Sequence, residues 1–342
     1  MTDFSELALL DATAQAELVR KKEVQPTELV EAAIDRIEAL NPKLNAVVTP
    51  MFAQARESAR GSLPEGPFTG EGWGGLVAEH ALTRSVRDSA ALLDATAGPE
   101  RGDPYWAPPA KRPFSKEVGA DPGILRIAHA TSPDFPVHED CRRAVEKAMA
   151  LCRDLGHQIE EIPLALDVPF EHFASCVRVV IAAATASLLK MLGAGPAQVE
   201  PMTWALYEMA QGIDGADYVL ALEQLQRSSR TIAGWFTRYD VLLAPTVPEP
   251  PPVLGSFDPA PENPLQGFDR AGHYVHLNPI ANVTGQPAVS VPLYWNAAGL
   301  PIGVHFMGRF GDEATLFRLA AQLETAQPWA YRTPPIHAAA EA

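Results

Sequence analysis

Apolar residues recur at helical spacing in the first hundred residues of the chain. In residues 26–40 they form a single helical stripe, at Leu29, Val30, Ala33, Ile34, Ile37 and Leu40. Pro26 suits the first turn of this helix, and Asn41-Pro42 predicts its end. Similar patterns predict helices at residues 12–22, 51–60 and 84–97, the last with Thr83 as its cap. LNAVV, at residues 44–48, reads as a short strand among these helices.

The pattern changes at residue 124, where strands begin to alternate with helices. ILRIAHA (124–130), a helix at 140–155 and HQIEEI (157–162) predict a β-α-β unit with two parallel strands. Apolar helices follow at residues 170–236, then strands at 240–246, 288–294 and 301–308, a proline-rich loop at 247–265 and a helix at 312–325. The predicted class is α/β, with one mixed sheet flanked by helices on both sides and strands near Val47, Ile127, Ile159, Leu243, Val289 and Val304.

Composition and charge narrow the expected partners. The formal net charge is −15, so nucleic acid and anionic membrane surfaces should be repelled, and neither is expected as a partner. The apolar run at residues 179–189 falls short of the ~20 residues that a membrane crossing needs, and predicts a buried helix. The first residues show no uninterrupted apolar segment typical of a secretory signal, and the three cysteines form no CxxC pair. A cytoplasmic location is therefore expected.

Several segments in a fixed order carry a family resemblance. They are DATAQAELVRKKEVQPTELVEAAIDRIEALNPKLNAVVTP, RSVRDSAALLDATAG, DVLLAPTVP, NVTGQPAVSVP, GLPIGVHFMG and LAAQLETAQPW. The chain resembles the amidase signature family, with segments similar to aminohexanoate cyclic-dimer hydrolases. The resemblance implies one amidase-like domain over residues 1–342, hydrolysis of C–N bonds in linear or cyclic amides, and no cofactor or metal.

The stretch GPFTGEGWGGLVAEH, at residues 66–80, departs from that family. The resemblance implies a lysine-bearing strand and a Gly/Ser-rich nucleophile segment after GPFTG, with a serine activated through a second serine by a neutral lysine. Here Gly70 passes through EGWGG directly to LVAEH, which predicts an internal deletion near residues 70–76 and the loss of part of the central sheet. None of the seven lysines matches the family's base, and Ser228-Ser229 lies in a polar helical stretch without glycine. No catalytic residue is therefore assigned, and the serine route is expected to be inactive.

Four residues are candidates for substrate binding. The resemblance places Cys176 and Trp204 in the acyl and amide pocket, and Gly285 and Gln286 near the substrate cavity. Core packing for Cys176 and Trp204, and a tight turn for Gly285, remain alternative interpretations. His172 and Cys176 lie four residues apart and could form a nucleophile pair. His273 and His276 with Asp269 have the wrong spacing for one metal site, so no metal is expected.

Two functions remain open from the sequence. The first is an amidase scaffold, an enzyme by resemblance only, that would take a small-molecule amide. The alternative is a binding or interaction protein that retains the pocket, for example as a partner of a complete homologue. Sheet edges exposed by the deletion would also make self-association possible.

Overall fold

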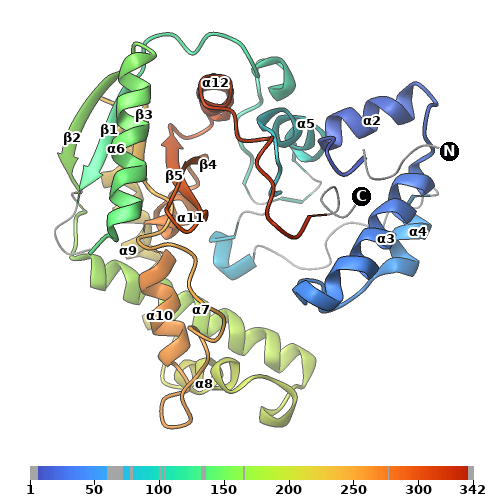
Figure 1. Cartoon of the computed structure of the whole chain (residues 1–342). Helices are drawn as coiled ribbons and strands as arrows, with labels where there is room; N and C mark the ends of the chain where they lie inside the picture. The colour runs from blue at the N-terminus through green and yellow to red at the C-terminus, as the bar shows by residue number, and fades with distance from the viewer. Residues whose placement is uncertain are drawn as a thin grey trace. The chain divides into compact units, whose positions relative to one another are not determined.

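The computed structural model describes residues 7–59, 72–77, 80–99, 102–103, 105–131, 136–164, 166–275 and 277–337 (Figure 1). The chain divides into two compact units, each assembled from separate segments. The first comprises Met1–Gly70, His80–Ala97 and Pro328–Ala342, and the second Glu71–Glu79 and Gly98–Gln327. The single domain expected over residues 1–342 stays a prediction, and the two units are described separately.

The described part of the first unit is helical, as predicted. Its helices are α2 (Ala12–Arg20), α3 (Pro26–Leu44), α4 (Phe52–Ser58) and α5 (Val86–Thr96). The cap of α5 is Ser85 rather than Thr83, because the Ser85 hydroxyl accepts the N–H of Asp88. Helix α3 continues past Pro42 to Leu44, since a proline in the last turn disturbs little of the helix that precedes it.

The prediction of a strand at residues 44–48 is wrong. Asn45 ends α3 with a left-handed conformation (φ 48°). The Asn41 side chain then makes two hydrogen bonds with the backbone of Val47, donating to its carbonyl (3.0 Å) and accepting its N–H (2.8 Å). These bonds satisfy the backbone groups that a neighbouring strand would otherwise take up, so the segment forms a helix-terminal loop.

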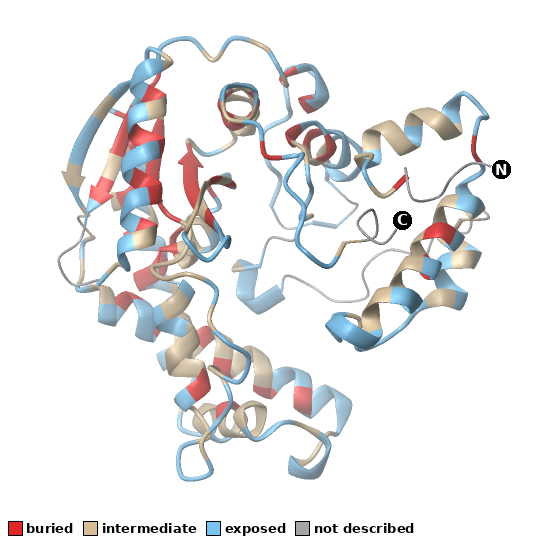
Figure 2. Ribbon diagram, viewed as in Figure 1, coloured by how far each residue is buried: buried red, intermediate tan, exposed pale blue. Residues whose placement is uncertain are grey.

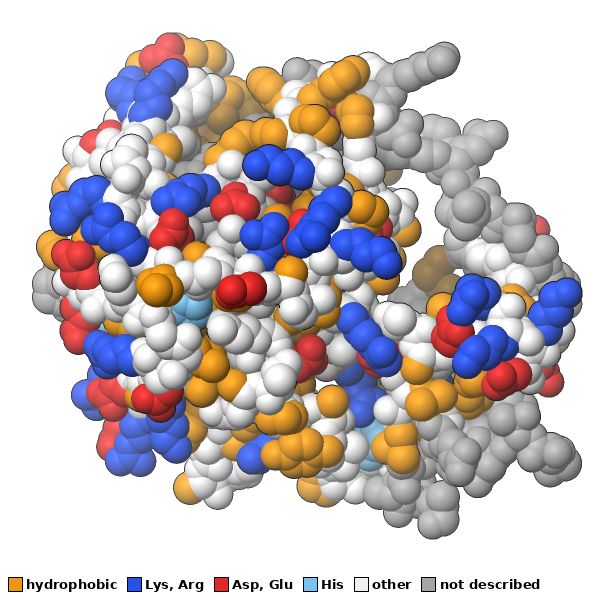
Figure 3. Space-filling view, turned by 90° about the horizontal axis from the view of Figure 1, so that it is seen from above, with side chains coloured by type: hydrophobic (Ala, Val, Ile, Leu, Met, Phe, Trp, Pro, Cys, Tyr) orange, Lys and Arg blue, Asp and Glu red, His pale blue; other side chains and the backbone are white. Residues whose placement is uncertain are grey.

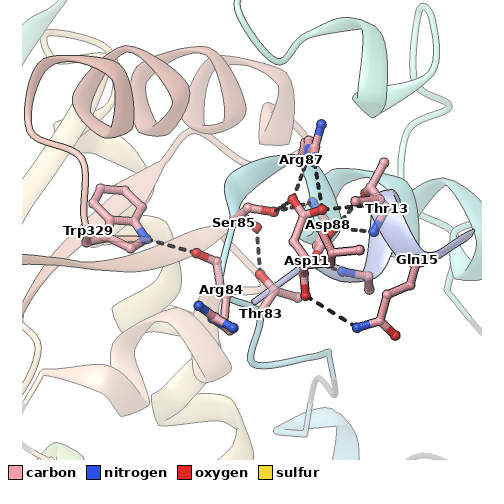
Figure 4. A network of polar contacts seen from close by, with 12 residues as sticks. Asp11, Thr13, Gln15, Thr83, Arg84, Ser85, Arg87, Asp88 and Trp329 are labelled. Carbon is pink, nitrogen blue, oxygen red and sulfur yellow. Dashed lines mark hydrogen bonds and ion pairs between the residues drawn. The ribbon is translucent and has the colours of Figure 1, made fainter. Parts of the chain in front are cut away.

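Two carboxylates join the start of α2 to the start of α5 (Figure 4). Asp11 caps α2 and accepts hydrogen bonds from the Ser85 hydroxyl (2.7 Å) and the Arg87 guanidinium (2.6 Å). Asp88 in turn accepts the backbone N–H groups of Ala12 (2.8 Å) and Thr13 (2.7 Å). Arg87 is the main cause that lowers the pKa of Asp11 to about 2. Each helix N-terminus is thereby supplied with an acceptor next to its positive dipole end.

The second unit contains a five-stranded mixed sheet. Its strands are β1 (Arg126–Thr131), β2 (Gln158–Pro163), β3 (Val241–Pro245), β4 (Ala288–Trp295) and β5 (Pro301–Gly308), in the order β2-β1-β3-β5-β4. Strand β1 is parallel to β2 and β3, while β5 is antiparallel to β3 and β4. The predicted β-α-β unit and mixed sheet are therefore confirmed.

Helices cover both faces of this sheet, as predicted. Helices α6 (Glu139–Asp154) and α12 (Glu313–Ala326) pack on one face. On the other face, α7 (Phe170–Leu192), α9 (Gly215–Trp235) and α11 (Asn278–Thr284) share a hydrophobic core with alternate residues of β1, β3 and β5, such as Ala128, Leu242 and Met307. Figure 2 shows that burial in this unit is concentrated in the inner strands of the sheet, while the edge strand β2 is largely exposed. This two-faced burial is what the near-continuous apolar sequence of β3 requires.

Three further elements complete the helical layer. Helix α8 (Pro201–Ala210) packs on α7 after a short 3-10 turn η3 (Pro196–Gln198), and η2 (Phe114–Lys116) contacts α12. Helix α10 (Gln266–Val275) follows the proline-rich loop and is held to α7 by an ion pair between Arg178 and Asp269 (2.7 Å). The hydrophobic periodicity of the sequence did not predict α10 or α11.

Helix α7 is only partly buried, which corrects the expectation of a buried helix. Among the described helices it is the one whose length and composition would allow a membrane crossing, with a mean hydropathy of 1.6, but a core helix passes the same test. One stripe that includes Phe173, Cys176 and Val180 is buried, whereas Met191 and Leu192 are exposed by 68% and 65%. The helix therefore has one packed face and one apolar face in contact with solvent.

The described part of the predicted junction, residues 72–77, forms a left-handed turn. Trp73 and Gly74 both have positive φ (49° and 63°) within η1 (Gly72–Gly75), and Trp73 is 46% exposed. Leu76 packs against the core of the second unit, and its carbonyl accepts the side-chain N–H of Asn282 (2.8 Å). The described segment forms no strand; residues 66–71 lie outside the described part.

Charged side chains of both signs are mixed on the surface shown in Figure 3, where Lys and Arg lie among Asp and Glu with apolar side chains between them. On that face, the Asp and Glu side chains are scattered and form no continuous acidic patch.

Candidate functional site

A groove of about 500 Å³ lies between α7 and α9 in the second unit. One wall is a stripe of α7 residues at helical spacing, His172, Ser175, Cys176 and Val179. Pro169 begins this helix and Gly193 ends it in a left-handed conformation (φ 62°), so the stripe lies in its N-terminal half.

The opposite wall is a stripe of α9, with Ile213 just before the helix. The α9 residues are Asp217, Leu220, Ala221, Gln224 and Arg227. Their spacing places them on one helix face, with a carboxylate at the N-terminal end, apolar side chains in the middle and a guanidinium at the C-terminal end. The groove therefore has two differently charged ends on either side of an apolar section.

Gln224 holds the basic end of the groove in place. This residue is buried, and its Nε2 donates to Asp167 (3.0 Å) while its Oε1 accepts from Arg227 Nη2 (2.8 Å). Arg227 also lies 3.8 Å from Glu223, a long ion pair on the exposed side of α9. The guanidinium is thus oriented by a neutral amide, with the carboxylates of Glu223 and Asp167 in its neighbourhood.

The acidic end is fixed by the start of α9. Asp214 caps the helix by accepting the N–H groups of Ala216 (2.7 Å) and Asp217 (2.9 Å). Asp217 completes a capping box, because its Oδ2 accepts the N–H of Asp214 (3.1 Å). Its other oxygen, Oδ1, takes no part in this cap.

Cys176 is a buried thiol in the α7 wall, with 5% of its surface exposed. Burial raises its pKa, while the hydrogen bond with Ser175 and the charge of Arg227 oppose the increase. The thiolate is therefore disfavoured at neutral pH. Among the described hydrogen bonds none joins the Cys176 sulfur to the His172 ring, so the geometry does not favour the nucleophile pair that the spacing left open.

The other predicted site residues lie apart from this groove. Trp204 is half-buried on α8, where it stacks on Tyr207 (4.6 Å between ring centroids) and donates to Glu208 (2.9 Å). Gly285 ends α11 with φ 69°, as expected if it serves a tight turn. Gln286 is buried, and its Nε2 donates to the carbonyl of Gly308 (3.2 Å). A substrate role for these three residues stays a prediction.

The paired serines lie inside α9, and their hydroxyls are already engaged. Ser228 donates to Asp167 (2.7 Å), and Ser229 donates to the carbonyl of Leu225 (2.9 Å). His273 makes an intrahelical contact with the carbonyl of Asp269 (2.8 Å), and His276 lies outside the described residues. In the part of the chain that is described, no group of three or more His, Cys, Asp or Glu side chains is arranged to hold a metal ion.

Sequence reasoning missed the α9 wall of the groove. The usable signal was the spacing of Asp217, Gln224 and Arg227, which are separated by seven and three residues and so share one helix face with Leu220. That spacing identifies a stripe, but only the packing of α9 against α7 shows that the stripe faces a groove.

Comparison with known proteins identifies the family. The amidase family model matches residues 75–317. The chain belongs to the amidase family. The match begins inside the predicted junction, and it includes both walls of the groove.

The relatives of this amidase-family chain include a 6-aminohexanoate-cyclic-dimer hydrolase of Paenarthrobacter ureafaciens. It is 26% identical over 475 positions, covering 95% of this chain and 96% of the relative. The chain has 342 residues, so a large share of the aligned positions has no residue from it. A putative amidase of Synechocystis sp. is 32% identical over 269 residues, covering 78% of this chain and 50% of the relative.

Solved structures share the fold. A 6-aminohexanoate cyclic dimer hydrolase complexed with substrate has a TM-score of 0.84 at 24% identity and covers 96% of this chain and 99% of its own. A bacterial aryl acylamidase has a TM-score of 0.61 at 21% identity and covers 74% and 55%. These likenesses place the mixed sheet and its helices in the amidase signature fold.

Proposed function

We propose that this amidase-family chain binds small amides in the groove between α7 and α9 and does not hydrolyse them by the serine route. The observation that carries the proposal is the position of Cys176, which resemblance places in an acyl and amide pocket and which lines the groove. The groove combines apolar side chains with a few polar groups, as small-molecule sites do.

The side chains that line the groove are suited to binding an amide but not to hydrolysing it. Val179 and Leu220 offer apolar surface to a hydrocarbon chain, and the Ser175 hydroxyl lies beside the Cys176 thiol. All seven lysines are among the described residues, and none lines the groove. The sequence also supplies no Gly/Ser-rich nucleophile segment, which supports the predicted internal deletion and an inactive serine route.

Titration calorimetry with hexanamide tests the binding. We expect saturable binding with a Kd of about 0.1–1 mM, because so small a ligand buries little surface. Val179→Phe should fill the groove and abolish binding, while Val219→Phe, on the exposed side of α9, should leave it unchanged. Equal affinity in both variants, or no heat of binding in the parent protein, would contradict the proposal.

A second candidate, an interaction protein that also self-associates, is favoured by the C-terminal end of α7. Leu188, Met191 and Leu192 are exposed by 49%, 68% and 65% within about one turn at the end of one helix. Apolar side chains clustered in this way are typical of protein contacts. Sedimentation velocity should show association that Met191→Glu weakens and that Met51→Glu, at another exposed methionine (58%) in the first unit, does not. A parent protein that sediments as a monomer at all concentrations would exclude this candidate.

A further inference from the structure

Strand β4 forms one edge of the five-stranded sheet, and part of its backbone faces away from the neighbouring strand. The carbonyl of Pro287 accepts the N–H of Gly308, at the end of β5 (2.8 Å), and hydrogen-bonded pairs then recur at every second residue of β4. Ala288 and Ser290 occupy the alternate pairs, so their N–H and C=O groups point outward. Both residues are exposed. None of the described hydrogen bonds outside the sheet ladder engages these backbone groups.

The sequence of β4 lacks the charges that usually protect a sheet edge. The strand reads AVSVPLYW and contains no charged residue. At the opposite edge, β2 carries Glu160 and Glu161 and ends at Pro163, so two copies of β2 side by side would bring carboxylates together. Pro292 offers no N–H, and a register shift follows Val291, which limits pairing along β4 to its first half. One edge of the sheet is therefore protected by charge, and the other is open over a short uncharged run.

We propose that the first half of β4 pairs with the same segment of a second copy of this chain, antiparallel and related by a twofold axis. When Ala288 of each copy lies opposite Ser290 of the other, every outward N–H in this pair of residues meets an outward carbonyl. Val289 of one copy then lies opposite Val289 of the other, which adds an apolar contact at the axis. The Ser290 hydroxyl is already bonded to the Thr246 hydroxyl (2.6 Å) and does not compete for the backbone groups.

The pattern of the strand favours a second copy as the occupant. The segment is complementary to itself, because its two outward residues are separated by one residue and can exchange bonds across a twofold axis. Neither copy brings a charge to the contact. The formal net charge of −15 opposes the approach of two copies at long range, so added salt should strengthen the association rather than weaken it.

This interface is separate from the groove and from the exposed end of α7, so the inference does not rest on amide binding. Measurements in a Met191→Glu background suppress any association through α7. Sedimentation equilibrium should then show a weak dimer, with a Kd on the order of 0.1 mM, because the paired segment is short. Hydrogen exchange of the Ala288 and Ser290 amides should slow as the protein concentration rises. The amides of Val289 and Val291 face β5 and are the internal reference.

A charge swap tests the register. Ala288→Lys/Ser290→Lys and Ala288→Glu/Ser290→Glu each place like charges opposite one another, and each variant alone should dimerise roughly fivefold more weakly than the parent. An equal mixture of the two variants should form a heterodimer at least as tightly as the parent forms its dimer. Ser290→Ala is the matched control, since it loses the hydroxyl contact with Thr246 but keeps the N–H, and it should dimerise like the parent.

Each outcome decides the proposal. Association of the mixture supports this register and shows that both charged variants are folded. A protein that stays monomeric up to about 1 mM has no such interface, and the proposal is then overturned. Charged variants that dimerise like the parent would place the contact elsewhere. Variants that fail to associate even when they are mixed would exclude the twofold pairing of Ala288 with Ser290.

Discussion

The carboxylate of Asp88, on α5, accepts two hydrogen bonds from Thr13, on α2, one from the backbone N–H (2.7 Å) and one from the hydroxyl (2.5 Å) (Figure 4). Asp88 is 6% exposed, so these bonds are made away from water. The relationship joins two helices that are about 75 residues apart in the sequence. It shows how the first unit is held together with little apolar core.

Removal of this carboxylate should loosen the first unit. Asp88→Ala leaves the N–H groups of Ala12 and Thr13 without an acceptor and should cost about 2–3 kcal/mol, whereas Thr13→Val loses only the hydroxyl and should cost about 1 kcal/mol. Hydrogen exchange of α2 measures the effect, together with the fluorescence of Trp329, whose indole donates to Arg84 in the same unit (3.0 Å). Exchange rates in Asp88→Ala that equal those of the parent protein would show that the Asp88 contacts contribute nothing.

His305 should make the second unit sensitive to mild acid. Burial in the middle of the sheet lowers the pKa of His305 to about 4, from 6.5. The folded state therefore resists protonation, so stability is complete above pH 6.5 and is lost as the pH falls toward 4. Between pH 6.5 and about pH 5 the free energy of unfolding should fall by roughly 2 kcal/mol.

His305→Gln is the control for this loss of stability. It removes the ionisable group and should flatten the curve of unfolding free energy against pH in that range. Urea unfolding at a series of pH values makes the measurement. A variant that keeps the same pH slope would assign the effect to another residue.

The junction should be sensitive to a single methyl group. A Cβ on Gly74 would lie 2.7 Å from the Tyr218 hydroxyl, whereas a Cβ on Gly193, which has nearly the same φ (62° against 63°), would have nothing within 4 Å. Gly74→Ala should thus destabilise the second unit by about 1 kcal/mol more than Gly193→Ala, since the backbone strain is matched. Tyr218→Phe should recover part of the difference in a double-mutant cycle. Equal losses in the two alanine variants would mean that η1 moves freely away from α9.

The three cysteines should react at different rates. Burial raises the pKa of Cys141 to about 11 and that of Cys152 to about 12, and both are fully buried. Cys176 also has a raised pKa but lines the groove, so iodoacetamide should modify it first, slowly at pH 7 and faster above pH 9. Mass spectrometry follows the three sites, and hexanamide should protect Cys176 alone. Rapid modification of Cys176 at pH 7 would indicate a thiolate and would favour its pairing with His172.

The sheet could be predicted from the sequence because its signal is local. Strand β3 is a short apolar run, and the β-α-β unit places a strongly patterned helix between two strands. The strand predicted at residues 44–48 has a similar composition, but Asn41 satisfies the backbone of Val47, and no strand of the described residues pairs with the segment. A strand forms only where a neighbouring strand can pair with it, and the local sequence pattern does not show whether such a neighbour exists.

The candidate site was predicted only in part for a related reason. Cys176 was found through family resemblance, and the structure places it in the groove. Arg227 and Asp217 carry no local signal, since charged residues on a helix usually face water. Their significance arises from the packing of α9 against α7, which is a tertiary contact.

The central claim is that the protein does not hydrolyse amides by the serine route. An assay for hydrolysis of hexanamide tests it most directly. Hexanoate is measured by NMR over a range of pH values, with the protein at a concentration near that of the substrate. We expect no hexanoate above the buffer blank, both in the parent protein and in the Ser228→Ala/Ser229→Ala variant. Turnover that survives in this variant and is lost in Cys176→Ala would contradict the claim and assign catalysis to the thiol.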